Sequence, residues 1–297
     1  MKIANLREIV FIAIGAASYG ILATFVQLAN DNGYKTAGLV FSQYVVGAIV
    51  LTTLAYFHKN KKAAAAPINL KNDKLKLLIF GSTLGFTSSF YYISIQYIPV
   101  SVAIILLMQT IWMAVVLEFF IARELINKTK IVGAIVALIG TAMAAKLFES
   151  NIQLDYRGVG FGLLAAVSYT GTMYASNRIA TALPSIVRSQ YLVYGGFIIV
   201  LLFWNFQIWE AFHWELFLKW GLFLGFFGTI LPPLLFNSAF PVVGTGLGGI
   251  IAALEIPVSV FSAYILLSEE ITSLQWLGIL VIILAVVLIN LNQLRKY

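Results

Sequence analysis

The chain has 297 residues, of which 61% are hydrophobic and only 10% charged, and its formal net charge is +7. A soluble domain has about 25% charged residues, so this chain has too few to cover a water-facing surface. It contains no cysteine and no Walker-type phosphate loop, which excludes a disulfide framework, a thiolate metal site and a nucleotide engine of that type.

The apolar residues fall into ten blocks, each long enough to cross a hydrocarbon core about 30 Å thick as a helix. None has the short alternating pattern of a β-barrel strand, and backbone polar groups in lipid must be paired within the segment. We therefore predict an all-α membrane protein with ten transmembrane helices. In chain order they span 9–28, 37–57, 75–95, 100–122, 130–147, 158–178, 186–205, 216–239, 245–267 and 273–293.

The basic residues are distributed unevenly between these helices. With the N-terminus inside, all but four of them lie in inner segments or at inner helix ends; the four outer ones are Lys35, Lys146, Arg157 and Lys219. This bias follows the positive-inside rule and predicts a multi-pass protein of the cell membrane with both termini in the cytoplasm. The positive charge is thus explained by topology, and we expect lipid rather than nucleic acid as the partner.

Residues of the first five blocks recur in the same order in the last five. Ala17-Ser18-Tyr19 matches Val167-Ser168-Tyr169, Ser42-Gln43-Tyr44 matches Ser189-Gln190-Tyr191, and Gly85 falls opposite Gly228. We predict two repeats, 1–147 and 158–297, joined by an outer connector, 148–157. Because five is odd, the second repeat enters the membrane from the opposite side, and inverted repeats of this kind are typical of secondary transporters.

The chain resembles the EamA-type branch of the drug/metabolite transporter superfamily along nearly its whole length. The resemblance rests on the paired first-helix segments above, on a Glu followed nine residues later by Gly (Glu124 to Gly133 and Glu269 to Gly278), and on Glu255-Ile256-Pro257. It implies ten helices around a central cavity and export or exchange of small metabolites. Members often carry an Arg in the second helix, where this chain has Gln43, so the resemblance implies no anion site there.

Glu255 is the sharpest candidate for the transport chemistry. It lies about ten residues into the ninth predicted helix, near the middle of the bilayer. A charged side chain at that depth costs about 2.5–3.5 kcal/mol on insertion scales and usually faces a cavity or a partner. Proton coupling, binding of a cationic amine, and a purely structural hydrogen-bonded Glu all remain open. Glu118, Glu124 and Glu269, which lie at or near helix ends, are predicted to be structural.

Polar and aromatic residues within the predicted helices suggest a mixed cavity wall. Each of them alone is more often an interhelical packing residue than a ligand contact. The candidate wall residues are Tyr19, Gln43, Ser88, Ser89, Tyr91, Tyr92, Gln109, Trp112, Tyr169, Thr172 and Asn237.

Four residues are candidates for helix breaks or a gate. Pro232 and Pro233 fall inside the eighth predicted helix and Pro257 inside the ninth, where an interior proline removes a backbone hydrogen bond. Pro257 is predicted to free the carbonyl of Ala253 beside Glu255. Arg188 begins the seventh helix, either as an inner-face anchor or as a gate.

These observations predict a secondary active transporter that exports or exchanges a small amino-acid-like or amine-bearing metabolite by alternating access, without a cofactor. Whether protons drive it, and its oligomeric state, stay open. A passive facilitator on the same scaffold is the main alternative. A membrane-embedded enzyme ranks lowest, because the twelve acidic residues are dispersed and only His58 and His213 are histidines.

Overall fold

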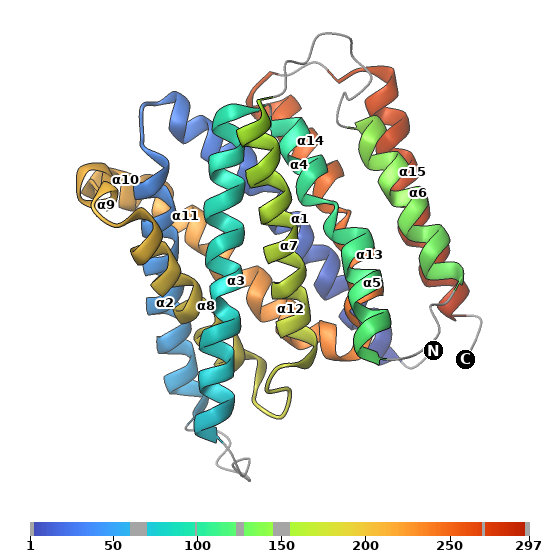
Figure 1. The fold of residues 1–297 in the computed structure, drawn as a ribbon, viewed down its shortest axis with the longest axis horizontal. Helices are drawn as coiled ribbons and strands as arrows, with labels where there is room; N and C mark the ends of the chain where they lie inside the picture. The colour runs from blue at the N-terminus through green and yellow to red at the C-terminus, as the bar shows by residue number, and fades with distance from the viewer. Residues whose placement is uncertain are drawn as a thin grey trace.

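The computed structural model describes residues 3–59, 70–98, 100–122, 128–144, 155–268 and 271–294, and every regular element among them is a helix (Figure 1). The first predicted repeat contains α1 (Ile3–Asp31), α2 (Thr36–Lys59), α3 (Leu70–Tyr97), α4 (Val100–Leu107), α5 (Thr110–Ala122) and α6 (Lys128–Ala144). The second contains α7 (Tyr156–Arg178), α8 (Ser185–Trp204), α9 (Gln207–Ala211), α10 (Trp214–Leu216), η1 (Phe217–Gly221), α11 (Leu222–Leu224), η2 (Gly225–Ile230), α12 (Leu231–Val243), α13 (Thr245–Ala252), α14 (Glu255–Leu266) and α15 (Ser273–Leu294).

The helices are those of a multi-pass membrane protein. Within the described residues, six stretches are long and apolar enough to cross a membrane by length and composition, and two shorter apolar helices lie at Ile131–Met143 and Ser273–Ala285. Each predicted apolar block is mainly helical in its described part, and the ten crossings remain a prediction. Glu124 and Glu269 lie outside the described residues.

The fourth and ninth predicted helices are not continuous, contrary to the prediction from the sequence. The fourth breaks between α4 and α5 and the ninth between α13 and α14. At both breaks a backbone hydrogen bond joins residues three apart instead of the four of an α-helix. Ile111 N–H donates to the Met108 carbonyl and Ile256 N–H to the Ala253 carbonyl, each at 3.0–3.1 Å. The prediction of a free Ala253 carbonyl is therefore wrong, because Ile256 takes the place of the proline nitrogen.

The eighth predicted helix is made of α10, η1, α11, η2 and α12. Its departures from α-helical geometry lie before Pro232 and Pro233 in the chain. Two π-helical stretches, η1 and η2, widen the helix up to Ile230, and Pro232 and Pro233 occupy the first turn of α12. Proline is tolerated in a first turn because the N–H groups there lack intrahelical acceptors. These prolines therefore fix the return to α-helical geometry and do not break an α-helix.

Corresponding helices of the two repeats run in opposite directions, and several of these pairs pack on each other. In Figure 1, α1 rises from the end of the bundle where α15 finishes, whereas α7 descends toward it. The equivalent residues Tyr19 and Tyr169 meet edge to face with ring centroids 5.8 Å apart. α2 packs on α8 and α6 on α15, and the fourth and ninth predicted helices meet through α5 and α13. Such self-pairing is the arrangement that an inverted two-fold relation produces.

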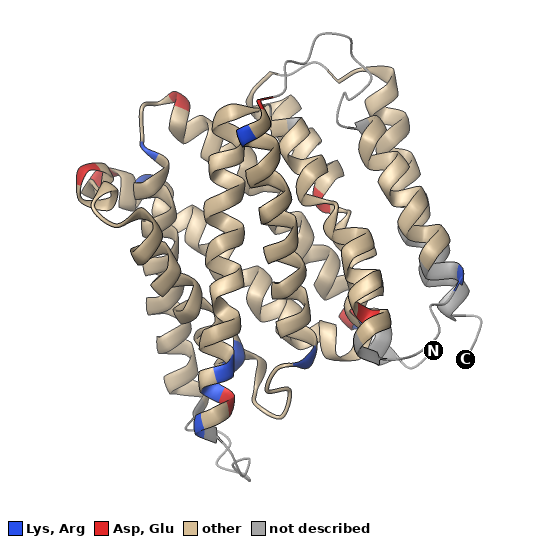
Figure 2. Ribbon diagram, in the orientation of Figure 1, with Lys and Arg blue, Asp and Glu red and all other residues tan. Residues whose placement is uncertain are grey.

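Charged side chains differ between the two ends of the bundle. Figure 2 shows lysines and arginines concentrated at the end of the bundle where α1 begins and α15 finishes. The opposite end carries Lys35 and Arg157, which pair with Glu210 and Asp155. The Arg157 guanidinium lowers the pKa of the Asp155 carboxyl group, which also caps the start of α7.

We expect single cysteines at His58 and His213 to be labelled from opposite sides of the membrane. His58 lies near the end of α2 and His213 directly before α10. Because the chain has no native cysteine, each variant carries one thiol. A membrane-impermeant maleimide applied to intact cells should label H213C only, and it should label H58C only after permeabilisation. Labelling of both variants from one side would refute the predicted topology.

Candidate functional site

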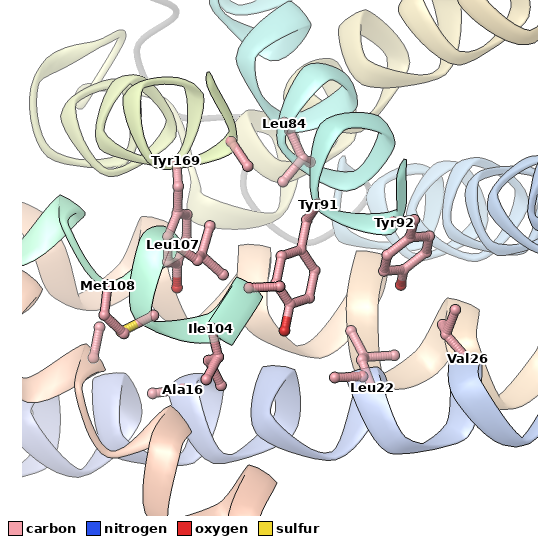
Figure 3. Packing of buried hydrophobic residues seen from close by; sticks show 14 of the residues in the cluster. Ala16, Leu22, Val26, Leu84, Tyr91, Tyr92, Ile104, Leu107, Met108 and Tyr169 are labelled. Carbon is pink, nitrogen blue, oxygen red and sulfur yellow. The ribbon is translucent and has the colours of Figure 1, made fainter. Parts of the chain in front are cut away.

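A small cavity lies where α1, α2, α3, α7 and the two broken helices meet. Figure 3 shows Tyr91, Tyr92 and Tyr169 reaching from α3 and α7 toward α1, with Leu107 between them. The lining combines aromatic and polar side chains with three leucines. The lining residues are Tyr19, Leu22, Gln43, Leu84, Thr87, Ser88, Tyr91, Tyr92, Leu107, Tyr169 and Glu255.

Glu255 provides the only carboxyl group among the described residues of this lining. It is buried, it begins α14 at the second break, and its Oε2 accepts a 3.4 Å hydrogen bond from the Tyr169 hydroxyl. The start of a helix carries about half a positive charge, which favours an anion at this position. The break therefore places a carboxylate in the protein interior and partly offsets the cost of burying its charge.

The tyrosine hydroxyls supply the remaining polar edge of the cavity. Tyr92 donates to Oε1 of Gln43 at 3.0 Å, and Tyr169 donates to Glu255. The Tyr91 hydroxyl is buried and has no hydrogen-bond partner in the described part of the chain. Because an unpaired buried hydroxyl is costly, Tyr91 is free to bond to a cargo or to water in the cavity.

Gln43 is held in place by the eighth predicted helix. The Thr229 hydroxyl donates to the Gln43 carbonyl at 2.9 Å, and Gly228 leaves the space that the Gln43 amide occupies. Its repeat counterpart Gln190 lies elsewhere and donates to the Tyr194 hydroxyl at 3.0 Å. The cavity thus uses one of two equivalent amides, and the two repeats have diverged in polarity.

The two breaks show the same divergence. The 145-residue offset that relates Gly133 to Gly278 also relates Thr110 to Glu255. Thr110 is fully buried and forms a 2.7 Å hydrogen bond with the Thr170 hydroxyl, directly beside the Tyr169 partner of Glu255. The second break therefore carries a carboxyl group where the first has a hydroxyl, and no Lys or Arg is among the described lining residues.

The cavity is too small for a metabolite in this conformation. The space open to the centres of water molecules is about 40 Å³. At roughly 10–15 Å³ per water centre, it accommodates a few waters. A metabolite with several heavy atoms therefore requires the surrounding helices or tyrosines to move.

Several predicted wall residues do not line this cavity. Trp112 is 41% exposed and donates to Gln109, whose own amide bonds to the Ile105 carbonyl one turn earlier. Thr172 shares a 2.9 Å hydrogen bond with Thr83 between α7 and α3. Their polar groups serve local hydrogen bonds and helix packing, which residue type alone does not distinguish from a cavity wall.

Asn237 and Ser89 likewise hold helices together. Asn237 donates to Ser189 and Pro233, and Ser89 accepts from Trp204. Conversely, the prediction missed the aliphatic residues of the lining, Leu22, Leu84 and Leu107, and one hydroxyl, that of Thr87. Helical spacing from Tyr91 already points to Thr87 and Leu84, four and seven residues earlier on the same face.

Arg188 forms a structural contact and does not reach the cavity. It is almost completely buried, and its guanidinium donates to the carbonyls of Ala175, Ser176 and Ile179 at the end of α7 and of Asn237 on α12, at 2.6–3.3 Å. Arg188 thus caps α7 from inside the bundle. Its role as a gate stays a prediction.

Two layers of side chains separate the cavity from the ends of the bundle. Toward the end that carries Lys35 lies a polar vestibule of about 590 Å³, whose lining includes Gln27, Ile95 and Gln96. From Tyr92 to Ile95 is about one helical turn, roughly 5 Å. We call this thin layer the outer barrier.

On the other side of the cavity lies an aromatic layer, which we call the inner barrier. Phe236 and Phe240 pack edge to face with centroids 5.0 Å apart, and Phe236 also meets the Tyr19 ring. A Cβ on Gly15 would come within 2.6 Å of the Phe236 ring, so the glycine permits this close approach. These rings make the inner barrier apolar.

The described residues contain no group of three or more His, Cys, Asp and Glu side chains that could hold a metal ion. The chemistry of the cavity therefore rests on one carboxyl group, one amide and hydroxyl groups.

Two segments of the chain, residues 6–145 and 156–291, match the sequence model of the EamA-like transporter family. The chain belongs to this family. It is a membrane transporter of the drug/metabolite type, built from two EamA repeats. A crystal structure described only as that of a protein is 13% identical in sequence and superposes with a TM-score of 0.74, covering 94% of this chain and 98% of the other. This likeness shows a shared fold. No functionally curated protein matches the chain.

Proposed function

We propose that this EamA protein is a secondary active transporter that moves a small amine-bearing metabolite across the cell membrane by alternating access. The observation that carries the proposal is Glu255, a single buried carboxylate in a cavity whose described lining has no basic residue. A lone carboxylate attracts a cation and repels an anion, so an ammonium group is the natural ligand.

The tyrosines complete a site suited to such a cargo. The ring faces of Tyr19, Tyr91, Tyr92 and Tyr169 can interact with a cation, and their hydroxyls can accept its hydrogens. Aliphatic side chains of the lining offer an apolar surface to the uncharged part of the cargo. We therefore assign cargo selection to charge and aromatic contact, with few dedicated hydrogen bonds.

Proton coupling follows from competition for one carboxylate. Glu255 binds either the cargo ammonium or a proton, so loading on one side releases the other. Exchange of one for the other across the membrane couples cargo export to proton entry. The 3.4 Å bond from Tyr169 is long enough for either ligand to displace it.

Alternating access requires that the two barriers open in turn. The breaks at α4–α5 and α13–α14 provide points where short helical segments can tilt. α5 and α13 belong to equivalent helices of the two repeats and pack on each other, so an exchange of conformations between the repeats opens one barrier as the other closes. A cavity that holds only a few waters supports alternating access over an open channel.

Transport of matched aromatic ions tests the proposal. Proteoliposomes with an imposed pH gradient should accumulate phenethylamine faster than protein-free liposomes with the same gradient, whereas uptake of 3-phenylpropionate, of similar shape and opposite charge, should be the same with and without the protein. The same vesicles without a gradient should only equilibrate the amine. Equal uptake of both compounds, or accumulation that ignores the gradient, would contradict the cation-selective active mechanism and favour a passive facilitator.

A further inference from the structure

The Tyr91 hydroxyl group is left without a partner at the cavity. Five buried side-chain polar atoms have no hydrogen-bond partner in the described part of the chain, and of these the Tyr91 hydroxyl alone belongs to a residue that lines the cavity. The side chain is 6% exposed, and Figure 3 shows its hydroxyl pointing from α3 toward α1. Since an unpaired buried hydroxyl costs free energy, this atom needs a partner that the described residues do not supply.

Two other tyrosine hydroxyls of the lining differ from Tyr91 in this respect. Tyr92, whose ring centroid lies 6.2 Å from that of Tyr91, donates to Gln43, and Tyr169 donates to Glu255. These two hydroxyls therefore hold the polar side chains of the cavity in place. The Tyr91 hydroxyl holds no side chain and remains available to a ligand.

Gln43 offers a second group to the same ligand. Its Oε1 accepts the 3.0 Å hydrogen bond from Tyr92, and no acceptor for its Nε2 is found among the described residues. A primary amide nitrogen carries two N–H donors. Because Tyr92 and the space at Gly228 fix the amide, these donors stay at the cavity.

Tyr91 belongs to a helix that lies outside the two breaks. α3 is continuous from Leu70 to Tyr97 and packs backbone to backbone on α8. A Cβ on Gly85 would collide with the Gly196 carbonyl, and a Cβ on Gly195 with the carbonyl of Leu78. Side chains on closely packed helices are positioned more precisely than those on loops, so we expect Tyr91 to keep its place when the segments at the breaks tilt.

The charge of the cavity decides which kind of group can bond to Tyr91 and Gln43. Glu255 supplies a carboxyl group, and the described lining contains no Lys or Arg. A carboxylate on the cargo would share this small cavity with Glu255 and would have no basic partner to offset its desolvation. A neutral hydroxyl or carbonyl group accepts hydrogen bonds from Tyr91 and Gln43 without adding a charge.

We propose that Tyr91 and Gln43 bind a neutral hydroxyl or carbonyl group that the cargo carries in addition to its ammonium group. The ammonium group rests on the proposed function, whereas the second group rests on the unpaired Tyr91 hydroxyl. The transporter then prefers amino alcohols or amino amides to simple amines and to zwitterionic amino acids.

Equilibrium binding of three matched amines tests this preference without a gradient. Phenylalaninol, its deoxy analogue 1-phenylpropan-2-amine and phenylalanine differ in the group beside the amine, which is hydroxymethyl, methyl or carboxylate. Isothermal titration of the protein in detergent measures each Kd at a pH that keeps the amines protonated. Phenylalaninol should bind at least about fivefold more tightly than its deoxy analogue and at least about tenfold more tightly than phenylalanine.

Three variants locate the groups that select phenylalaninol. Y91F keeps the ring and removes the unpaired hydroxyl, so the preference for phenylalaninol over its deoxy analogue should fall to within about twofold. Q43M has a side chain of similar length without the amide and should also lower the preference. Y194F removes a hydroxyl that bonds to Gln190 on α8, outside the cavity lining, and should leave the preference intact.

The results separate this inference from the proposed function. Equal binding of phenylalaninol and its deoxy analogue overturns the inference and leaves the proposed function standing, because both compounds carry the ammonium group. A preference that Y91F and Q43M both retain also overturns it, since the selecting group then lies elsewhere. Tighter binding of phenylalanine than of phenylalaninol overturns the exclusion of a carboxylate. If neither amine binds, the proposed function is contradicted together with the inference.

Discussion

E255Q should lose gradient-driven accumulation of phenethylamine by at least about 100-fold while remaining folded in the membrane. Glutamine keeps the size of the side chain and can still accept the hydrogen bond from Tyr169. It carries no charge and binds no proton, so it removes both the attraction for the ammonium group and the competition that couples it to protons. The measurement is initial uptake driven by a pH gradient in proteoliposomes, after subtraction of the uptake by protein-free liposomes with the same gradient.

The matched control is D73N, which neutralises an acid in the first turn of α3, outside the cavity lining. It should retain uptake within about twofold. Thermal midpoints of both variants in detergent should equal that of the unmodified protein, which separates loss of transport from loss of folding. Uphill uptake by E255Q with an unchanged pH profile would assign Glu255 a structural role and move the coupling site elsewhere.

The sequence predicted the helical scaffold well because long apolar blocks in lipid have few alternatives to a helix. It also located the central members of the cavity, since Tyr19 and Tyr169 occupy equivalent positions of a repeat and Glu255 is costly at its depth. Equivalent residues that contact each other, as Tyr19 and Tyr169 do, lie near the axis of an inverted repeat, where the two halves meet.

The errors arose where hydrogen-bond partners decide the outcome. Trp112 and Gln109 have the residue types of a cavity wall, yet they bond to each other, with Trp112 exposed on the bundle surface. No periodicity reveals that a helix changes to three-residue bonding at Met108, because that break contains no proline. For Ala253, the prediction correctly identified the missing donor, since Pro257 has no N–H. The N–H of Ile256 replaces it only because the backbone bends at this point, which the sequence does not show.

The last carbonyls of α1 and of its counterpart α7 receive their hydrogen bonds from different donors, and Arg188 is the donor at α7. α1 is followed by Gly33, whose φ of +85° allows a tight turn in which its N–H bonds to the Asn30 carbonyl. α7 has no glycine after its last turn, and Ala180 takes a positive φ of 50° instead. The Arg188 guanidinium then supplies the donors that the carbonyls at the end of α7 require.

R188L should therefore destabilise the protein strongly. It removes this donor from four buried carbonyls, of which Ala175 keeps the Ile179 N–H, and each of the others left unpaired costs about 1–3 kcal/mol. A loss of several kcal/mol should lower the thermal midpoint by more than about 10 °C or prevent accumulation of folded protein. R188K should recover only part of the stability, because one ammonium cannot reach four carbonyls in the directions of the planar guanidinium.

R178L is the comparison, since Arg178 is exposed in the last turn of α7 and carries the same charge. It should change the thermal midpoint by only a degree or two. Fluorescence-detected size-exclusion after heating measures all three variants without requiring a known cargo. If the thermal midpoint of R188L equals that of R178L, the four hydrogen bonds do not hold α7 against α12. Arg188 would then return to the role of a gate or an inner-face anchor, whose loss changes transport but not unfolding.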